Sequence, residues 1–111
     1  YWGRDRREGT LDLSWLIKRM TSDTAAVVGL NDRGVIAPGF KAVINVIDHE
    51  RLTIERPYMV HDLPKGGKRL LQKARGYVAT IVSGETVYRE GEATGALPGR
   101  LVRGAQAAPA A

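Results

Sequence analysis

The chain has 111 residues, of which 43% are hydrophobic and 26% are charged, and its net charge is +5. This length and composition are typical of one modest globular domain and exclude wholesale disorder. The absence of cysteine excludes disulfides, thiolate metal sites and cysteine nucleophiles, and it fits the reducing cytoplasm, which is the location we expect. No apolar run approaches the roughly 18 residues of a membrane helix, so we expect no membrane partner.

Helical patterns follow a charged segment at residues 1–10, which we expect to be a loop. Asp12 is a suitable N-cap, because its carboxylate can accept a hydrogen bond from the first helical turn. The next apolar residues lie at i, i+3, i+4 and i+7, the spacing of one helical face: Leu13, Leu16, Ile17 and Met20. A second, short helix is predicted from the capping cluster at residues 21–23 to Val28, and Gly29 ends it.

Turns and a strand come next. Residues 31–34 (NDRG) and 37–39 (APG) predict turns, because glycine tolerates a positive φ and proline fixes its own φ. The β-branched residues at 35–36 and 42–47 predict strands. Because residues 42–47 lack polar alternation, we expect this strand to be interior, with apolar cover on both faces.

Short strands and turns make up the remaining chain. We expect a short edge segment at 52–54, an extended loop at 58–67, and strands at 69–73 and 77–82. Ser83 and Gly84 predict a tight hairpin into residues 86–88, after which residues 90–92 turn the chain out of the sheet. Residues 95–103 are expected to form an exit segment, and the Ala/Pro-rich residues 105–111 to be disordered.

Two blocks of the sequence carry a family resemblance. Residues 29–48 read GLNDRGVIAPGFKAVINVID, and residues 76–104 read GYVATIVSGETVYREGEATGALPGRLVRG. Both blocks resemble the amidohydrolase superfamily, and most closely its D-aminoacylases, or N-acyl-D-amino-acid deacylases. The resemblance extends from about Asp12 to Gly104, with Val43 where family members usually carry aspartate.

The resemblance implies an α+β fold, in which two N-terminal helices precede a mainly antiparallel β region. In this family such a segment leaves the catalytic barrel and enters a small composite β-sandwich built from both chain ends. Three parts follow from this: a loop and the last barrel helices at residues 1–30, the C-terminal portion of the sandwich at 31–104, and a disordered tail at 105–111.

The metal chemistry of the family lies outside this chain. Members activate water with one or two divalent metals, usually zinc, and the resemblance places all their ligands before the helix that begins at Leu13. His49 and His61 are the only histidines, and neither has a histidine at i+2 or i+4. Three serines are each interpreted as a cap or turn residue, because none lies in the G-x-S-x-G motif of a nucleophile: Ser14, Ser22 and Ser83. We therefore predict no catalytic, cofactor-binding or metal-binding residue here, with zinc implied only for the full-length enzyme.

The resemblance implies that the full-length protein hydrolyses the amide C–N bond, not a peptide bond, of N-acyl-D-amino acids. This chain alone is expected to be inactive, and its main partner is the catalytic barrel of its own polypeptide. The apolar helical stripe and the strand at 42–47 also predict self-association, through apolar surface or an open sheet edge. The alternative is a free-standing basic β module that binds a protein or nucleic acid. That reading requires basic residues grouped on one face, and their dispersal argues against nucleic acid.

Overall fold

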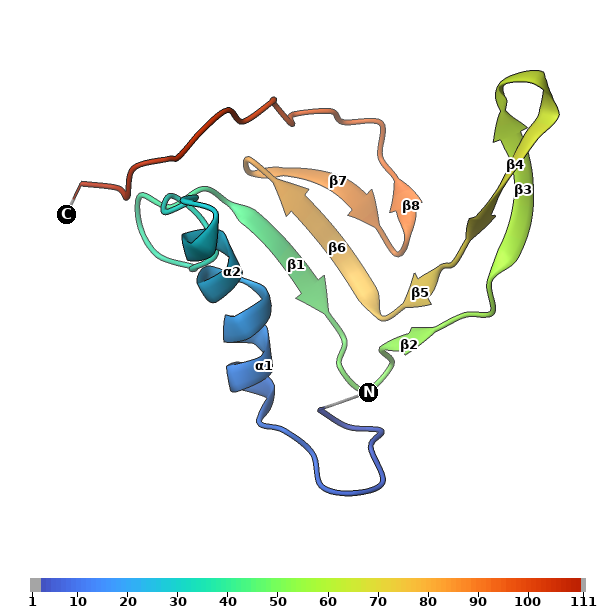
Figure 1. Ribbon diagram of the computed structural model, residues 1–111, viewed down its shortest axis with the longest axis horizontal. Helices are drawn as coiled ribbons and strands as arrows, with labels where there is room; N and C mark the ends of the chain where they lie inside the picture. The colour runs from blue at the N-terminus through green and yellow to red at the C-terminus, as the bar shows by residue number, and fades with distance from the viewer. Residues whose placement is uncertain (1–2, 111) are drawn as a thin grey trace. The chain divides into compact units, whose positions relative to one another are not determined.

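The computed structural model describes residues 3–110 and divides into two compact units (Figure 1). Residues 1–42 and 100–111 belong to the first unit, and residues 43–99 to the second. Residues 1, 2 and 111 lie outside the described part, so the structure covers the predicted N-terminal loop and C-terminal tail only in part. Residues 3–10 contain neither helix nor strand, as predicted for a loop.

Both predicted helices are present in the first unit: α1 (Leu13–Met20) and α2 (Ser22–Val27). The Asp12 carboxylate caps α1, because it accepts hydrogen bonds from the backbone N–H of Trp15 at 2.8 Å and from the Ser14 hydroxyl at 2.5 Å. These bonds hold the pKa of Asp12 below its usual range, the Ser14 bond having the larger effect. Lys18 and Arg19 form ion pairs with Asp23 of α2, which connects the two helices.

A compact loop follows α2. Gly34 has a φ of +88°, and a Cβ atom there would lie 2.9 Å from the Ser22 Cα, so only glycine fits. The turn at 37–39 is confirmed by a 3.2 Å hydrogen bond from the Phe40 N–H to the Ala37 carbonyl. The strand predicted at 35–36 is wrong, because these two residues fall between two turns and meet no partner strand.

The C-terminal segment of the first unit returns to the end of α2. Gln106 forms a parallel bridge with Leu30. Its N–H donates to the Gly29 carbonyl at 2.8 Å, and its carbonyl accepts from the Asn31 N–H at 3.2 Å. Within residues 105–111, Gln106 therefore has defined backbone partners.

An antiparallel four-stranded sheet dominates the second unit, with the order β1-β6-β7-β8. Its strands are β1 (Val43–Ile47), β6 (Tyr77–Val82), β7 (Glu85–Arg89) and β8 (Glu92–Ala93). The β6–β7 hairpin is confirmed, and Ser83 and Gly84 both have positive φ, at 52° and 84°. Glu90 and Gly91 repeat this geometry, at 47° and 84°. They turn the chain back into β8, so the prediction that it leaves the sheet here is wrong.

Two antiparallel ribbons complete the second unit (Figure 1). One pairs β2 (Thr53–Ile54) with β5 (Ala74–Arg75), and the other pairs β3 (Tyr58–Leu63) with β4 (Gly67–Leu71). The extended loop predicted at 58–67 is wrong, since a 3₁₀ turn (η1, Pro64–Gly66) folds it into a hairpin. Positive φ at Lys65 (58°) and Gly66 (73°) makes this reversal, and Met59 then pairs with Leu70.

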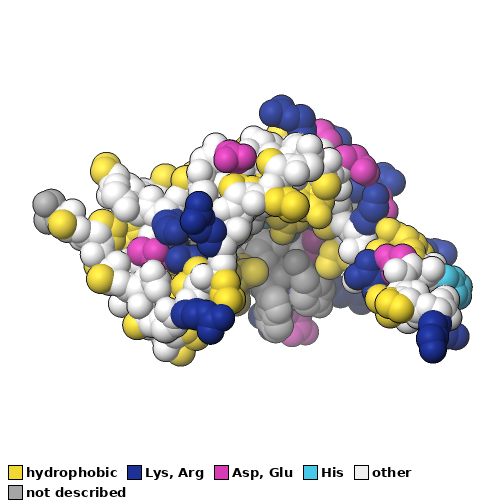
Figure 2. Space-filling view, turned by 90° about the horizontal axis from the view of Figure 1, so that it is seen from above, with side chains coloured by type: hydrophobic (Ala, Val, Ile, Leu, Met, Phe, Trp, Pro, Cys, Tyr) yellow, Lys and Arg dark blue, Asp and Glu magenta, His cyan; other side chains and the backbone are white. Residues whose placement is uncertain are grey.

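The α+β class with a mainly antiparallel β region is confirmed, but no described residue is fully buried. Four of the five β1 residues are exposed, so the interior strand expected at 42–47 is not interior in this chain. Figure 2 accordingly shows hydrophobic side chains at the surface among the charged ones. The aliphatic strands have side chains suited to a core, and this chain alone does not enclose one.

Candidate functional site

The two histidines lie on different elements of the second unit. His49 follows β1 at the corner before β2, and His61 lies in β3. Among residues 3–110 there is no group of three or more His, Cys, Asp or Glu side chains placed to hold a metal ion. A catalytic zinc needs three protein ligands and an open position. The donors in this part of the chain therefore do not fit the zinc that the family resemblance implies for the full-length enzyme.

The serines have local structural environments. Ser14 donates its hydroxyl hydrogen bond to Asp12 in the α1 cap. Ser22 is the first residue of α2, and Ser83 occupies the β6–β7 turn with a φ of 52°. Ser83 therefore lies in a turn, as predicted, whereas Ser14 and Ser22 lie within helices whose N-caps are Asp12 and Thr21.

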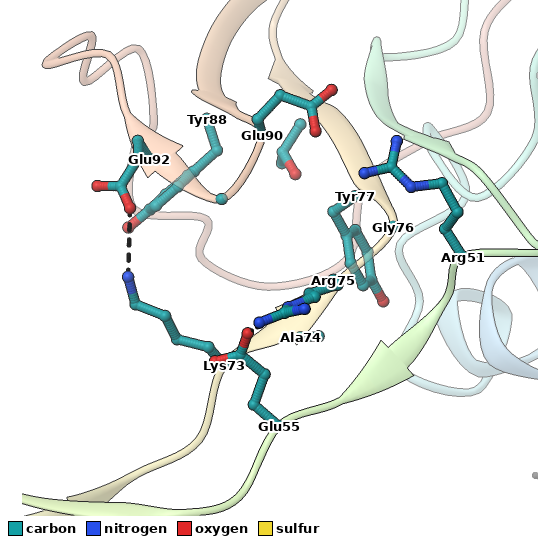
Figure 3. A pocket seen from close by; sticks show the side chains of 12 residues that line it. Arg51, Glu55, Lys73, Ala74, Arg75, Gly76, Tyr77, Tyr88, Glu90 and Glu92 are labelled. Atoms are coloured by element: carbon teal, nitrogen blue, oxygen red, sulfur yellow. Dashed lines mark hydrogen bonds and ion pairs between the residues drawn. The ribbon is translucent and has the colours of Figure 1, made fainter.

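A polar pocket lies in the second unit, beside the ribbon β2–β5 and the strands β6–β8. Its volume is about 470 Å³. Its charged side chains are three basic and three acidic, and two tyrosines contribute aromatic surface (Figure 3): Arg51, Lys73, Arg75, Glu55, Glu90, Glu92, Tyr77 and Tyr88. None of these residues was singled out from the sequence.

Ion pairs organise the wall of this pocket. Lys73 Nζ lies 3.2 Å from Glu92 Oε1, and Arg75 Nε donates to Glu55 Oε1 at 2.6 Å (Figure 3 shows the first pair). The hydrogen bond to Glu92 raises the pKa of the Lys73 ammonium above its usual value. Lys73 is therefore held protonated at neutral pH and is a poor general base or nucleophile.

The pocket is lined by charged side chains of both signs. Its lining contains no histidine, cysteine or serine, and its opposite charges are balanced in number. A sequence signal for it exists in retrospect. Lys73 and Arg75 are two residues apart, and side chains at i and i+2 lie on the same face of extended chain.

A second hollow lies in the first unit beside α1. It has a volume of about 700 Å³ and is mainly apolar, with Leu13, Ile17 and Val35 among its lining residues. Ile17 is 45% exposed and Met20 is 73% exposed. Of the apolar stripe predicted for this helix, Leu13, Ile17 and Met20 are therefore exposed among the described residues, and Leu16 is half-buried.

Basic residues occur in both units. Ion pairs join many of them to nearby carboxylates, from Arg33–Asp32 in the first unit to Arg69–Asp62 in the β3–β4 hairpin. Each such pair places a negative charge beside the positive one. No helix among residues 3–110 is long and apolar enough to cross a membrane.

Comparison with known proteins gives one match. The model of the amidohydrolase family matches residues 3–88, which is most of the chain. Neither the curated proteins nor the solved structures contain a match to this sequence. The matched range includes α1, α2 and the strands up to Tyr88, the fourth of the five residues of β7.

Proposed function

Because this chain belongs to the amidohydrolase family, we propose that it is the C-terminal structural part of a metal-dependent hydrolase that deacylates N-acyl-D-amino acids. In this role it completes a small β-sandwich and packs against the catalytic barrel. It contributes no residue to the chemistry. The metal ligands and the substrate-binding residues belong to the preceding part of the same polypeptide.

The observation that carries this proposal is the absence of any fully buried side chain among the described residues. Burying a Val, Leu or Ile side chain stabilises a fold by about 1.5–3 kcal/mol. Here Val43 and Val46 of β1 are 53% and 45% exposed, and Ile54 of β2 is 69% exposed. Their burial requires further protein, and a barrel and additional strands of the same enzyme supply it.

The D-amino-acid substrate class rests on the two resembling sequence blocks. Residues 29–48 and 76–104 carry it, and the family match supports hydrolase chemistry at the coarser level. Zinc is proposed only for the whole enzyme, where it would polarise the amide carbonyl and activate water. The absence of cysteine fits an enzyme of the reducing cytoplasm, where we propose that it acts.

The rival reading, a free-standing basic module, has no observation in its favour. Ion pairs such as Lys73–Glu92 and Arg75–Glu55 place acidic side chains beside basic ones, which argues against it. The exposed aliphatic strands also have no explanation in a complete small domain.

The test is immunoprecipitation of the native protein from its source cell with an antibody raised against this chain. The precipitate is assayed for release of amino acid from N-acetyl-D-amino acids and from their L enantiomers. We expect a polypeptide several times heavier than 12.1 kDa, since a barrel of about 250 residues is added. We expect activity on the D substrates that a chelator abolishes and zinc restores.

The outcomes separate the levels of the proposal. A heavy polypeptide that hydrolyses other amides, and not N-acyl-D-amino acids, would overturn the substrate class and keep the hydrolase. A native polypeptide near 12.1 kDa would overturn the structural role altogether.

A further inference from the structure

The loop that connects α2 to β1 is closed on itself. The Lys41 N–H donates to the Asp32 carbonyl at 2.8 Å, which joins the two ends of residues 32–41. Inside the loop the Phe40 N–H donates to the Ala37 carbonyl at 3.2 Å. Compact surface loops with joined ends are often functional elements. Because the first unit is left after residue 42, the conformation of this loop fixes the point where the chain leaves that unit.

A segment distant in the sequence lies against this region of the first unit (Figure 1). It consists of residues 105–109 (AQAAP), and we call it the strap. The Gln106 N–H donates to the Gly29 carbonyl at 2.8 Å, and its carbonyl accepts from the Asn31 N–H at 3.2 Å. The Gln106 side-chain amide also donates to the Ala105 carbonyl at 3.1 Å. The strap is therefore held by backbone hydrogen bonds just before the loop begins.

Two glycines leave room for the strap, one before the loop and one inside it. A Cβ atom added to Gly29 would lie 3.0 Å from the Ala105 Cβ. One added to Gly39 would lie 2.9 Å from the Pro109 Cβ. Both glycines have positive φ, at 75° and 83°, which disfavours any other residue. Pro109 is half-buried, although residues 107–108 before it are exposed. The strap thus contacts the loop region at both of its own ends.

The composition of the strap suits close docking. Alanine loses almost no side-chain entropy when it is ordered. Proline restricts the undocked chain, so that less backbone entropy is lost on docking. Both sides of the contact belong to residues 3–110, so no further protein is needed to complete it. An Ala/Pro-rich segment of this kind can therefore act as an ordered element.

We propose that the strap holds the loop of residues 32–41 in one conformation, and with it the point where the chain leaves the first unit. Contacts before the loop and inside it restrain the loop from both sides. Release of the strap would free the loop while both helices stay formed, and the bond between Lys41 and Asp32 would open more often. This inference goes beyond the proposed function and is independent of its substrate. The immunoprecipitation can fail while the strap holds, and the reverse is equally possible.

Hydrogen exchange followed by mass spectrometry tests the strap in the native polypeptide that contains this chain, through peptides that include Asn31 and Lys41. Ala105→Leu adds bulk beside Gly29, where one added carbon would already lie 3.0 Å from the Ala105 Cβ. The Asn31 amide should then exchange about fivefold to tenfold faster, the effect of losing one backbone hydrogen bond. The Lys41 amide should also exchange faster, because its bond closes the loop that the strap holds. Ala107→Leu is the matched control, since it adds the same bulk at an exposed strap residue and should leave both amides unchanged.

A second pair of variants removes a backbone donor instead of adding bulk. Gln106→Pro lacks the N–H that donates to the Gly29 carbonyl, so it should accelerate exchange at both amides. Ala108→Pro is its control, because it changes an exposed strap residue and should have no effect. All four substitutions lie outside the helices and strands, and circular dichroism should be the same for each.

Three outcomes would overturn the proposal. The first is an unprotected Asn31 amide in the wild-type chain, since the strap would then not be docked. The second is an equal effect, or none, in the two variants and their two controls. The third is faster exchange at Asn31 alone, because the strap would then be docked without holding the loop closed at Lys41.

Discussion

Gly76 and Leu52 are packed so closely that a Cβ atom added to Gly76 would lie 2.7 Å from the Leu52 Cα. It would also lie 2.8 Å from the Leu52 backbone nitrogen and 2.9 Å from the carbonyl oxygen of Asp48. Gly76 has a φ of +92°, and its own carbonyl accepts a 2.8 Å hydrogen bond from the Asp48 N–H. A glycine between β5 and β6 thus allows the corner after β1 to close against the start of β6.

Substitution of this glycine should destabilise the second unit strongly. A side chain at positive φ costs about 1–2 kcal/mol, and contact with rigid backbone adds about 1–3 kcal/mol. Gly91→Ala is the matched control, because Gly91 has a φ of +84° but nothing within 4 Å of a built Cβ. Thermal unfolding followed by circular dichroism should show a larger fall in Tm for Gly76→Ala than for Gly91→Ala. Equal falls would mean that the backbone contact is unimportant.

The two tight turns of the sheet offer a stabilising change. Ser83 and Glu90 each hold a positive φ immediately before a glycine, at 52° and 47°. Asn-Gly is the preferred pair for such turns, because asparagine tolerates this conformation better than serine or glutamate. Ser83→Asn and Glu90→Asn should each stabilise the sheet by about 0.5 kcal/mol. The corresponding rise in Tm is about 2–4 °C. Ser83→Val, which is β-branched and strained at positive φ, should lower Tm instead.

Local patterns predicted the elements that depend on local interactions. The Asp12 cap, the apolar spacing after it and the glycine at 29 are sufficient to place both helices, which form as predicted. The Ser83–Gly84 hairpin is equally local, since a two-residue turn fixes the pairing of its strands.

Some of the errors occurred where a turn could be interpreted in two ways. Pro64 and two glycines were taken as signs of an irregular loop, yet Lys65 and Gly66 use positive φ to reverse the chain, and β3 then pairs with β4. The charged pocket was missed because Glu55, Lys73 and Glu92 are far apart in the sequence. Only the pairing of β2 with β5 and of β7 with β8 brings them together.

The cap of α1 should make helix formation sensitive to acid. The Ser14 and Trp15 hydrogen bonds lower the folded pKa of Asp12 relative to the unfolded chain, where it is about 3.9. The contribution of the carboxylate is therefore complete above that unfolded value and is lost as pH falls through the lower folded pKa. Asp12→Asn retains an acceptor without titrating. Circular dichroism at 222 nm should show that the wild-type chain loses helix signal as the pH falls. The Asp12→Asn variant should lose less of this signal. Asp12→Ala should have reduced helix signal at neutral pH already. If Asp12→Asn left the pH dependence of the helix signal unchanged, the loss of helix in acid would come from other carboxylates.

The ion pair of the β3–β4 hairpin should be measurable by titration. Arg69 donates to both carboxylate oxygens of Asp62, with Nε–Oδ1 at 2.8 Å and Nη2–Oδ2 at 2.5 Å. This hydrogen bonding lowers the pKa of Asp62, and the nearby positive charge contributes as well. Arg69→Gln removes that charge, so NMR titration should show the pKa of Asp62 rising toward about 3.9. Lys68→Gln removes the neighbouring charge without breaking this pair and should leave the titration almost unchanged. Because both side chains are about half exposed, salt near 1 M should also raise the wild-type pKa. If Arg69→Gln left the pKa of Asp62 unchanged, the pair of hydrogen bonds between Arg69 and Asp62 would not persist in solution.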